Sequence, residues 1–246
     1  MNHALSPHEA RLRRVVWLCC LVGAIHTFIY CAAFPFFSVV DEQCHLDLAV
    51  RYSQAELPRK LASPCSEALL YIAIYGTPEY LWTPESQPGK HIAAPPWTLP
   101  IEVIQQNLVD KENIWREKVK NHEASQPPAY YTLAGAWWWL GKALHLDGLT
   151  LLYWLRFLNV PLMLLLVWLG GWVARQIFPE IDFIRVAVPA LIALLPQSGF
   201  YAINNDILSP ICFGLTFWLV LDFCRSEAPV PPTSTTLRWM VSITLR

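Results

Sequence analysis

Four long apolar runs constrain this chain more than any other feature of its sequence. They cover residues 15–37, 150–174, 185–203 and 207–224. A helix needs about 20 apolar residues to cross the hydrocarbon core of a bilayer, and each run is close to that length. The chain is 54% hydrophobic and only 15% charged, whereas soluble domains are about 25% charged. The sequence therefore predicts an all-α, multi-pass integral membrane protein.

The first apolar run is best interpreted as a retained span. Arg11, Arg13 and Arg14 come just before it. The run is longer than the roughly 7–15 apolar residues of a cleaved signal peptide. Arginine and lysine concentrate on the cytoplasmic side of membrane proteins, which predicts a cytoplasmic N-terminus. The net charge of −1 provides no basic surface for nucleic acid.

The run 129–146 is the apolar stretch whose position is most open. If it crosses the bilayer, Arg175 and Arg185 fall on the outer side. If it does not, these arginines share the cytoplasmic side with Arg225 and Arg238, which the usual distribution of positive charge favours. The run is also short and rich in Trp and Tyr, which prefer the headgroup region. We therefore expect an interfacial or re-entrant helix.

This topology predicts about four spans in a single membrane module, 1–246. Residues 38–149 then form one large external segment, and residues 204–206 form a second external loop. Residues 238–246 have the composition expected for the start of a fifth span. The chain is thus organised like the N-terminal part of a longer membrane protein. Both external loops are expected to face the same compartment.

Asp41, Glu42, His45 and Asp47 follow the first span directly. Ser38 and Asp41 match a capping box with Ser38 as the N-cap, which alone would explain the acidic residues. It would not explain His45, which lies four residues after Asp41 and would share its helix face. A carboxylate beside an imidazole can act in acid–base chemistry or bind an acceptor. We expect Asp47 to be solvated.

Arg156 lies within the run 150–174, about two turns from its outer end. Arginine at the centre of a membrane helix costs about 2.5–3.5 kcal/mol. Its side chain therefore either extends to the bilayer surface or has a function. The functional alternative is a guanidinium that binds a lipid phosphate, with Asn159 on the same helix face. Gln126, just before the expected interfacial helix, is a further candidate for substrate contact.

The second external loop contains Asn205 and Asp206. Both residue types are common in turns and helix caps, so Asp206 could simply cap the span that follows. On the same side as Asp41, it could also help to bind a divalent cation or to position an acceptor hydroxyl. Cys44 and Cys65 lie in the first external segment and could pair in an oxidising compartment.

Four motifs occur in a characteristic order: "VVDEQCHLDLA", "SQPPAYYTLAGAWWWLG", "LRFLNVPLMLLLVWLGGWVARQIF" and "ALIALLPQSGFYAINNDILSPICFGLTFWLVL". In this order they resemble the N-terminal half of the GT-C superfamily of membrane glycosyltransferases. The resemblance is to bacterial relatives of the dolichyl-phosphate-mannose–protein mannosyltransferases and to a bacterial membrane family related to them. It covers nearly the whole chain except residues from about 57 to 120.

The resemblance implies transfer of a sugar from a polyprenyl-phosphate donor to an acceptor on the external face of a bacterial inner membrane. It assigns the first-loop acid, a base or metal ligand, to Asp41 with Glu42 beside it, and the second-loop acid to Asp206. It places Gln126 and Arg156 at the substrate. The alternative hypothesis is a non-catalytic membrane protein: a binder of a lipid-linked sugar, an assembly partner or a remnant.

Overall fold

A computed structural model describes residues 6–37, 41–57, 63–76, 85, 94, 96–118, 120–195 and 200–227. Within these ranges every regular element is a helix. The helices are α1 (Pro7–Ala33), α2 (Glu42–Ser53), α3 (Ser66–Tyr75), η4 (Pro96–Thr98), α4 (Ile101–Lys118), η5 (His122–Ser125), α5 (Pro128–Ala143), α6 (Gly148–Arg156), α7 (Asn159–Ile177), α8 (Asp182–Leu194) and α9 (Leu208–Glu227). Arg238 and the expected start of a fifth span, 238–246, lie outside the described residues.

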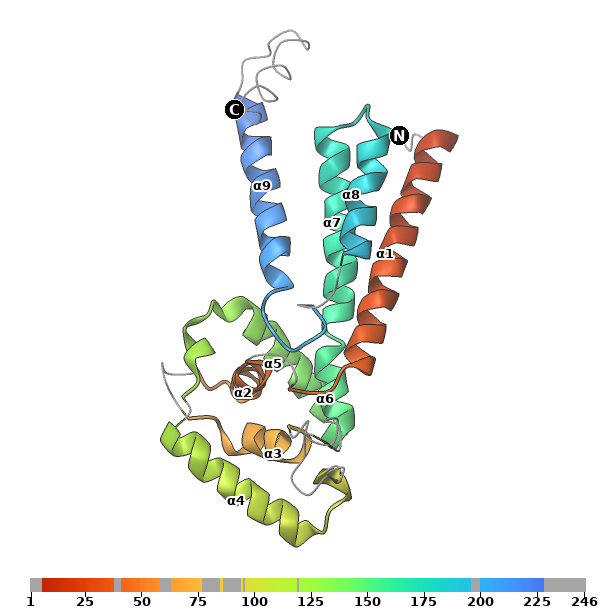
Figure 1. The fold of residues 1–246 in the computed structure, drawn as a ribbon. Coiled ribbons are helices and arrows are strands. Elements are labelled where there is room, and N and C mark those ends of the chain that lie inside the picture. The colour runs from red at the N-terminus through yellow and green to blue at the C-terminus, as the bar shows by residue number, and fades with distance from the viewer. Residues whose placement is uncertain are drawn as a thin grey trace.

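The helices form two layers (Figure 1). α1, α7, α8 and α9 run along the long axis of the molecule, where α7 packs against the other three. α2, α3, α4 and α5 lie across one end, with α2 packed between α3 and α5. We call this end, where α1 stops and residues 200–207 lie, the loop end. The opposite end, where α1 begins, is the N-terminal end.

Three helical stretches within the described ranges are long and apolar enough to cross a bilayer: Pro7–Ala33, Gly148–Ile177 and Leu208–Arg225. The expected span over 185–203 is shorter in the structure, because α8 stops at Leu194. Its 13 residues extend only about 20 Å, against about 30 Å of hydrocarbon. The helix stops there because the sequence continues with Pro196, and a residue before proline is disfavoured in the helical region.

The expected span over 150–174 is divided into α6 and α7 at Phe157 and Leu158. Pro161 explains the break: it has no N–H for the carbonyl of Phe157, four residues earlier, and its ring clashes with that carbonyl. The Phe157 carbonyl instead accepts a hydrogen bond from the Val160 N–H at 3.1 Å. The break lies next to Arg156 at the loop end, where α6 meets α5.

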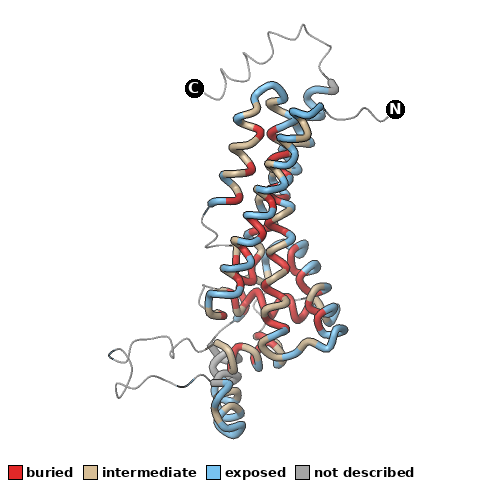
Figure 2. Tube along the Cα trace, turned by 90° about the vertical axis from the view of Figure 1, so that its right-hand side faces the viewer, coloured by how far each residue is buried: buried red, intermediate tan, exposed pale blue. Residues whose placement is uncertain are grey.

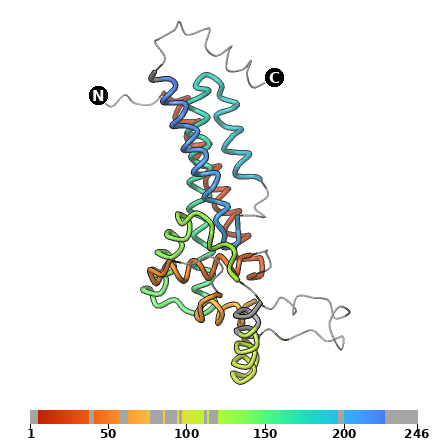
Figure 3. The backbone as a smooth tube through the Cα atoms, turned by 90° about the vertical axis from the view of Figure 1, so that its left-hand side faces the viewer, coloured from red at the N-terminus to blue at the C-terminus, as the bar shows by residue number. Residues whose placement is uncertain are grey.

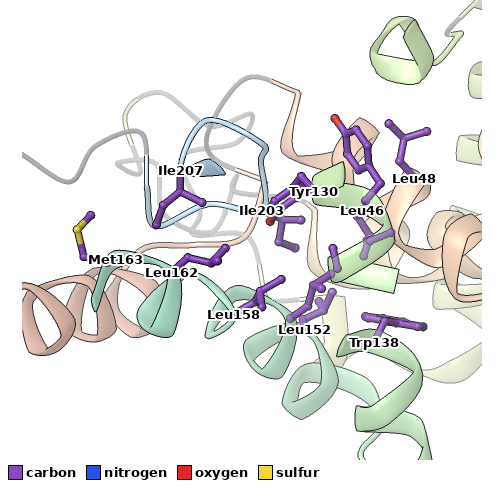
Figure 4. Packing of buried hydrophobic residues seen from close by; sticks show 14 of the residues in the cluster. Leu46, Leu48, Tyr130, Trp138, Leu152, Leu158, Leu162, Met163, Ile203 and Ile207 are labelled. Atoms are coloured by element: carbon purple, nitrogen blue, oxygen red, sulfur yellow. The ribbon is translucent and has the colours of Figure 1, made fainter. Parts of the chain in front are cut away.

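Buried residues are concentrated at the loop end, whereas the long helices expose much of their surface (Figure 2). Trp138 of α5, Leu46 of α2, Leu152 of α6 and Ile203 are at most 1% exposed and share one cluster (Figure 4). Large apolar side chains on the long helices remain exposed, such as Phe213 of α9 at 73%. An exposed apolar surface of this kind suits contact with lipid acyl chains.

α2 and α5 approach each other closely at Gly135. A Cβ atom added there would lie 2.7 Å from the Ser53 nitrogen and 2.8 Å from the Tyr52 carbonyl carbon. Both contacts are to backbone, which cannot move aside as a flexible side chain can. α5 covers most of the run 129–146 and lies across the loop end (Figure 1). Its position at the bilayer surface stays a prediction.

The start of α1, the α7–α8 turn and the end of α9 lie together at the N-terminal end (Figure 3). Arg185 donates to both carboxylate oxygens of Glu9 at 2.8 Å, and Arg225 donates to the carbonyl of Gln176 at 3.1 Å. Arg175 lies 3.6 Å from the same Glu9 carboxylate. The arginines of these short connections therefore group at one end, as the sequence predicted.

Candidate functional site at the loop end

Glu42 and Arg156 form a fully buried ion pair at the loop end. Arg156 Nε donates to Glu42 Oε1 and Nη2 donates to Oε2, both at 2.8 Å, and both side chains are 0% exposed. This two-pronged geometry is the strong arrangement between a guanidinium and a carboxylate. The pair joins the first turn of α2 to the end of α6, residues 114 positions apart in the chain.

All five N–H groups of Arg156 have protein partners. Besides Glu42, they donate to the carbonyls of Cys31 at 3.4 Å, Phe34 at 2.6 Å and Pro35 at 2.8 Å. The guanidinium carbon also lies 4.0 Å from the centre of the Phe36 ring. Of the two alternatives for Arg156, extension to the bilayer surface is wrong, because the end of α1 encloses the guanidinium. In this geometry no donor is left for a lipid phosphate.

Glu42 is equally engaged. Its Oε2 accepts from the Phe37 N–H at 2.7 Å, and its Oε1 accepts from the Ile203 N–H at 3.0 Å. Together with Arg156, these bonds link the chain after α1, the start of α2, the end of α6 and the loop before α9. Glu42 therefore connects the first external loop, which begins after α1, to the second external loop before α9. The sequence predicted that both loops face one compartment.

The loop before α9 also contacts three other predicted site residues or contains them: Asn159, Gln126 and Asn205. Asn159, 0% exposed, donates to the Ala202 carbonyl at 2.7 Å. Asn205 donates to the Gln126 side-chain oxygen at 3.4 Å. Asp206 is exposed, and its backbone and carboxylate contact the Asn204 side chain at 3.2 and 3.3 Å. The structure thus brings these predicted residues to one loop, around residues 202–206.

A small cavity of about 160 Å³ lies beside this loop. It opens between the start of α5 and the start of α9, and its lining includes Pro127, Tyr130, Asn205 and Ser209. Asn205 lines the cavity, and its side chain contacts Gln126, the residue before Pro127. The cavity is large enough to hold part of a sugar.

Asp41 is the N-cap residue of α2 and adopts a left-handed conformation with φ of 69°. Its side chain makes no capping hydrogen bond; Oδ1 instead lies 3.3 Å from His122 Nε2. The predicted capping box is therefore wrong, because α2 begins at Glu42 rather than after Ser38, which lies outside the described residues. The Asp41 side chain is 31% exposed.

His45 turns away from that carboxylate into the protein. Its Nδ1 lies 2.7 Å from the Tyr131 hydroxyl of α5, and the residue is 6% exposed. Burial lowers the pKa of His45 to about 4, although the nearby Asp41 carboxylate raises it. His45 is therefore neutral near pH 7, and it joins α2 to α5 rather than pairing with Asp41.

Asp47 is buried at 0% exposure, so the expectation that it is solvated is wrong. Arg51 Nε donates to both of its oxygens at 3.2 Å, the Cys65 N–H donates at 2.7 Å and Asn121 Nδ2 donates at 2.8 Å. The i,i+4 spacing of Asp47 and Arg51 could have indicated the pair. Nothing in the sequence indicated Asn121, the N-cap residue of η5, which also donates to the Cys44 carbonyl at 2.9 Å.

Asp41, Cys44 and His122 place one potential metal-ligand atom each within 4.8 Å of one another. Cys44 and Cys65 are both free thiols in the structure. Burial, with smaller effects from the nearby acids, raises the pKa of each thiol to about 12. No described contact joins Asp41 to Asp206, so the proposed cation site between them stays a prediction.

Residues 20–246 match the model of a family described as "Predicted membrane protein (DUF2142)". The chain belongs to this family. DUF2142 membership agrees with the three membrane-spanning candidates. The protein therefore associates with the lipid bilayer. No curated protein and no solved structure matches the chain. The DUF2142 description names no reaction, and the polar residues of the loop end are the ones on which a reaction could take place.

Proposed function

We propose that this protein is a membrane glycosyltransferase that moves a sugar from a polyprenyl-phosphate donor to an acceptor at the loop end. The loop end then faces the outside of a bacterial inner membrane, with the N-terminus in the cytoplasm. The observation that supports this most is Asp41: a partly exposed carboxylate, held at the start of a helix whose next residue is locked by Arg156. A catalytic carboxylate needs this combination of access and fixed position.

In the proposed reaction, an acceptor hydroxyl oxygen attacks the anomeric carbon of the donor. The bond between that carbon and the phosphate oxygen breaks, and polyprenyl phosphate leaves with the bonding electrons. The acceptor proton passes to Asp41, which acts as the base or orients the hydroxyl. Gln126 and Asn205 hydrogen-bond the sugar at the edge of the loop-end cavity, and Asp206, exposed beside it, orients the acceptor.

Glu42, Arg156 and Asn159 have a positioning role in this proposal. Their polar groups are buried and bonded within the protein, so they fix the two loops without touching substrate. His45 likewise fixes α2 against α5 through Tyr131. The phosphate would then be bound by groups other than Arg156, which has no free donor.

A non-catalytic protein that binds a lipid-linked sugar is the second candidate. The complete engagement of Glu42 and Arg156 favours it, since two residues that resemble catalytic ones serve the fold instead. The two candidates differ in turnover: a binder retains the donor intact, whereas the transferase releases polyprenyl phosphate.

The test is a transfer assay in proteoliposomes with the full chain. Radiolabelled polyprenyl-phosphate hexoses and pentoses serve as donors, and a bacterial membrane extract serves as the acceptor. We expect labelled acceptor and free polyprenyl phosphate in equal amounts, and a reduced rate in Asp206→Asn. Asp110→Asn, an exposed acid on α4, is the matched control and should act like the wild type. Donor binding without release of polyprenyl phosphate would support the binder instead.

A further inference from the structure

We propose that Asp41, Cys44 and His122 form a zinc site at the start of α2. The site is assembled from two segments: Asp41 and Cys44 from the first turn of α2, and His122 from η5. The inference follows from the ligand atoms and not from sugar transfer, although the two share Asp41, which would bind the ion through Oδ1 and keep Oδ2 for the acceptor hydroxyl.

The spacing of the Asp41 and His122 ligand atoms matches tetrahedral zinc, and the Cys44 sulfur lies close by. Two ligand atoms bound at about 2.0–2.2 Å and separated by the tetrahedral angle lie about 3.3–3.6 Å apart. Asp41 Oδ1 and His122 Nε2 are 3.3 Å apart, and the Cys44 sulfur lies within 4.8 Å of both. A small side-chain adjustment would therefore bring all three atoms to one ion.

The Cys44 thiol provides an independent indication of a ligand. Cys44 is 2% exposed, and its sulfur makes no hydrogen bond within the described part of the chain. It points to the same small group of atoms as Asp41 and His122. A thiolate requires a cation or donors when buried, and a bound zinc ion deprotonates such a thiol outright.

The two segments are held together by groups that do not bind the ion. Asn121, 1% exposed, donates to the Cys44 carbonyl and to Asp47. These bonds fix η5 against the first turn of α2 and hold the imidazole of His122 beside Asp41. Such preformed geometry lowers the cost of assembling ligands from distant segments.

The chemistry of the ligand atoms selects the metal. One sulfur, one imidazole nitrogen and one carboxylate oxygen suit Zn²⁺ or Co²⁺, whereas Mg²⁺ and Ca²⁺ prefer oxygen alone. Three protein ligands leave a fourth position open, as in catalytic zinc sites. The exposure of Asp41 and His122, 31% and 56% of their side chains, gives that position access from solvent.

Glu123 is the main competitor for His122. Its Oε1 lies 3.2 Å from the same Nε2 atom, so without metal both acids contact one imidazole nitrogen. A bound ion would occupy that nitrogen and release Glu123 or accept it as a fourth ligand. The measurement must therefore separate a metal site from a simple group of two acids and a histidine.

The experiment uses the full chain in detergent, reduced and stripped of metal, and titrated with Co²⁺. We expect one equivalent to bind, with intense visible absorption from four-coordinate Co²⁺ and a near-ultraviolet thiolate-to-metal band. Cys44→Ser should abolish the thiolate band, while Cys65→Ser, the matched control, should retain it. His122→Asn should weaken Co²⁺ binding by at least about tenfold, since removing a residue that only orients a ligand already costs about 10–100-fold; His145→Asn should not.

Circular dichroism of each variant verifies folding; His122 is half exposed, so its replacement leaves the packing intact. Zn²⁺ should displace Co²⁺ and bleach the visible bands, and Mg²⁺ in large excess should not. Absence of the thiolate band in the wild type, or its survival in Cys44→Ser, would overturn the zinc site. Either result would leave the proposed sugar transfer standing, since that reaction needs the Asp41 carboxylate but neither a metal ion nor Cys44.

Discussion

The ion pair between Glu42 and Arg156 provides a sharp test of how the loop end is held together. Replacing Arg156 with Met keeps most of the side-chain volume and removes the charge. Glu42 would remain buried at 0% exposure without its partner. Removing one member of a buried pair costs about 3–5 kcal/mol. The hydrogen bonds from Arg156 to the carbonyls of Phe34 and Pro35 would also be lost, so we expect the upper part of that range.

The assay is unfolding by SDS in mixed micelles, followed by circular dichroism, for a double-mutant cycle. Arg156→Met and Glu42→Gln should each destabilise strongly. The double variant should lose much less stability than the sum of the two single losses. We expect a coupling energy near the upper end of the roughly 0.5–3 kcal/mol found for contacting residues, because the second substitution removes the buried charge that the first one left without a partner.

Lys142 and Glu67 provide the matched control. Their ion pair has the same 2.8 Å distance, but the side chains are 50% and 23% exposed. Exposed pairs contribute about 0–1 kcal/mol, so Lys142→Met should have a small effect. If Arg156→Met were as mild as Lys142→Met, the conclusion that the buried pair organises the loop end would be refuted.

Two further predictions concern packing and topology. Gly135→Ala should destabilise the protein by about 1–3 kcal/mol in the same SDS assay, because the new methyl group meets backbone of α2; Gly214→Ala meets only a leucine side chain and should be neutral or slightly stabilising. A membrane-impermeant maleimide applied to spheroplasts should label Ser125→Cys in η5 and Asp206→Cys in the loop before α9, both exposed, but not Glu180→Cys in the α7–α8 turn. Labelling of only one loop-end site would contradict the shared compartment.

The apolar runs and the arginine positions were enough to predict the helical class and the grouping of arginines at one end. Helix limits were predictable only where proline was taken into account. Pro161 divides the run 150–174, and Pro196 follows the end of α8. Both prolines are visible in the sequence. Pro161 acts through its missing N–H and its ring, and Pro196 acts by disfavouring the helical conformation of the residue before it.

The partners of buried polar residues could not be predicted in the same way. Arg156 meets Glu42 across 114 positions, and Asn121 meets Asp47 across 74. No local period relates such residues, because the contacts depend on how α2, α5 and α6 pack. The local sequence around Arg156 does not indicate whether its side chain is buried or exposed, so only tertiary structure separates a residue that positions the loops from one that binds substrate.

The most direct test of the proposed function is the kcat of sugar transfer in Asp41→Asn. Asparagine tolerates the left-handed conformation of residue 41, and Asp41 makes no capping bond, so the fold should be retained with nearly unchanged stability. Loss of a catalytic base costs about 10²–10⁴-fold, and we expect a decrease in kcat in that range while Asp110→Asn keeps the wild-type rate. A folded Asp41→Asn protein that transfers sugar at the wild-type rate would contradict the assignment.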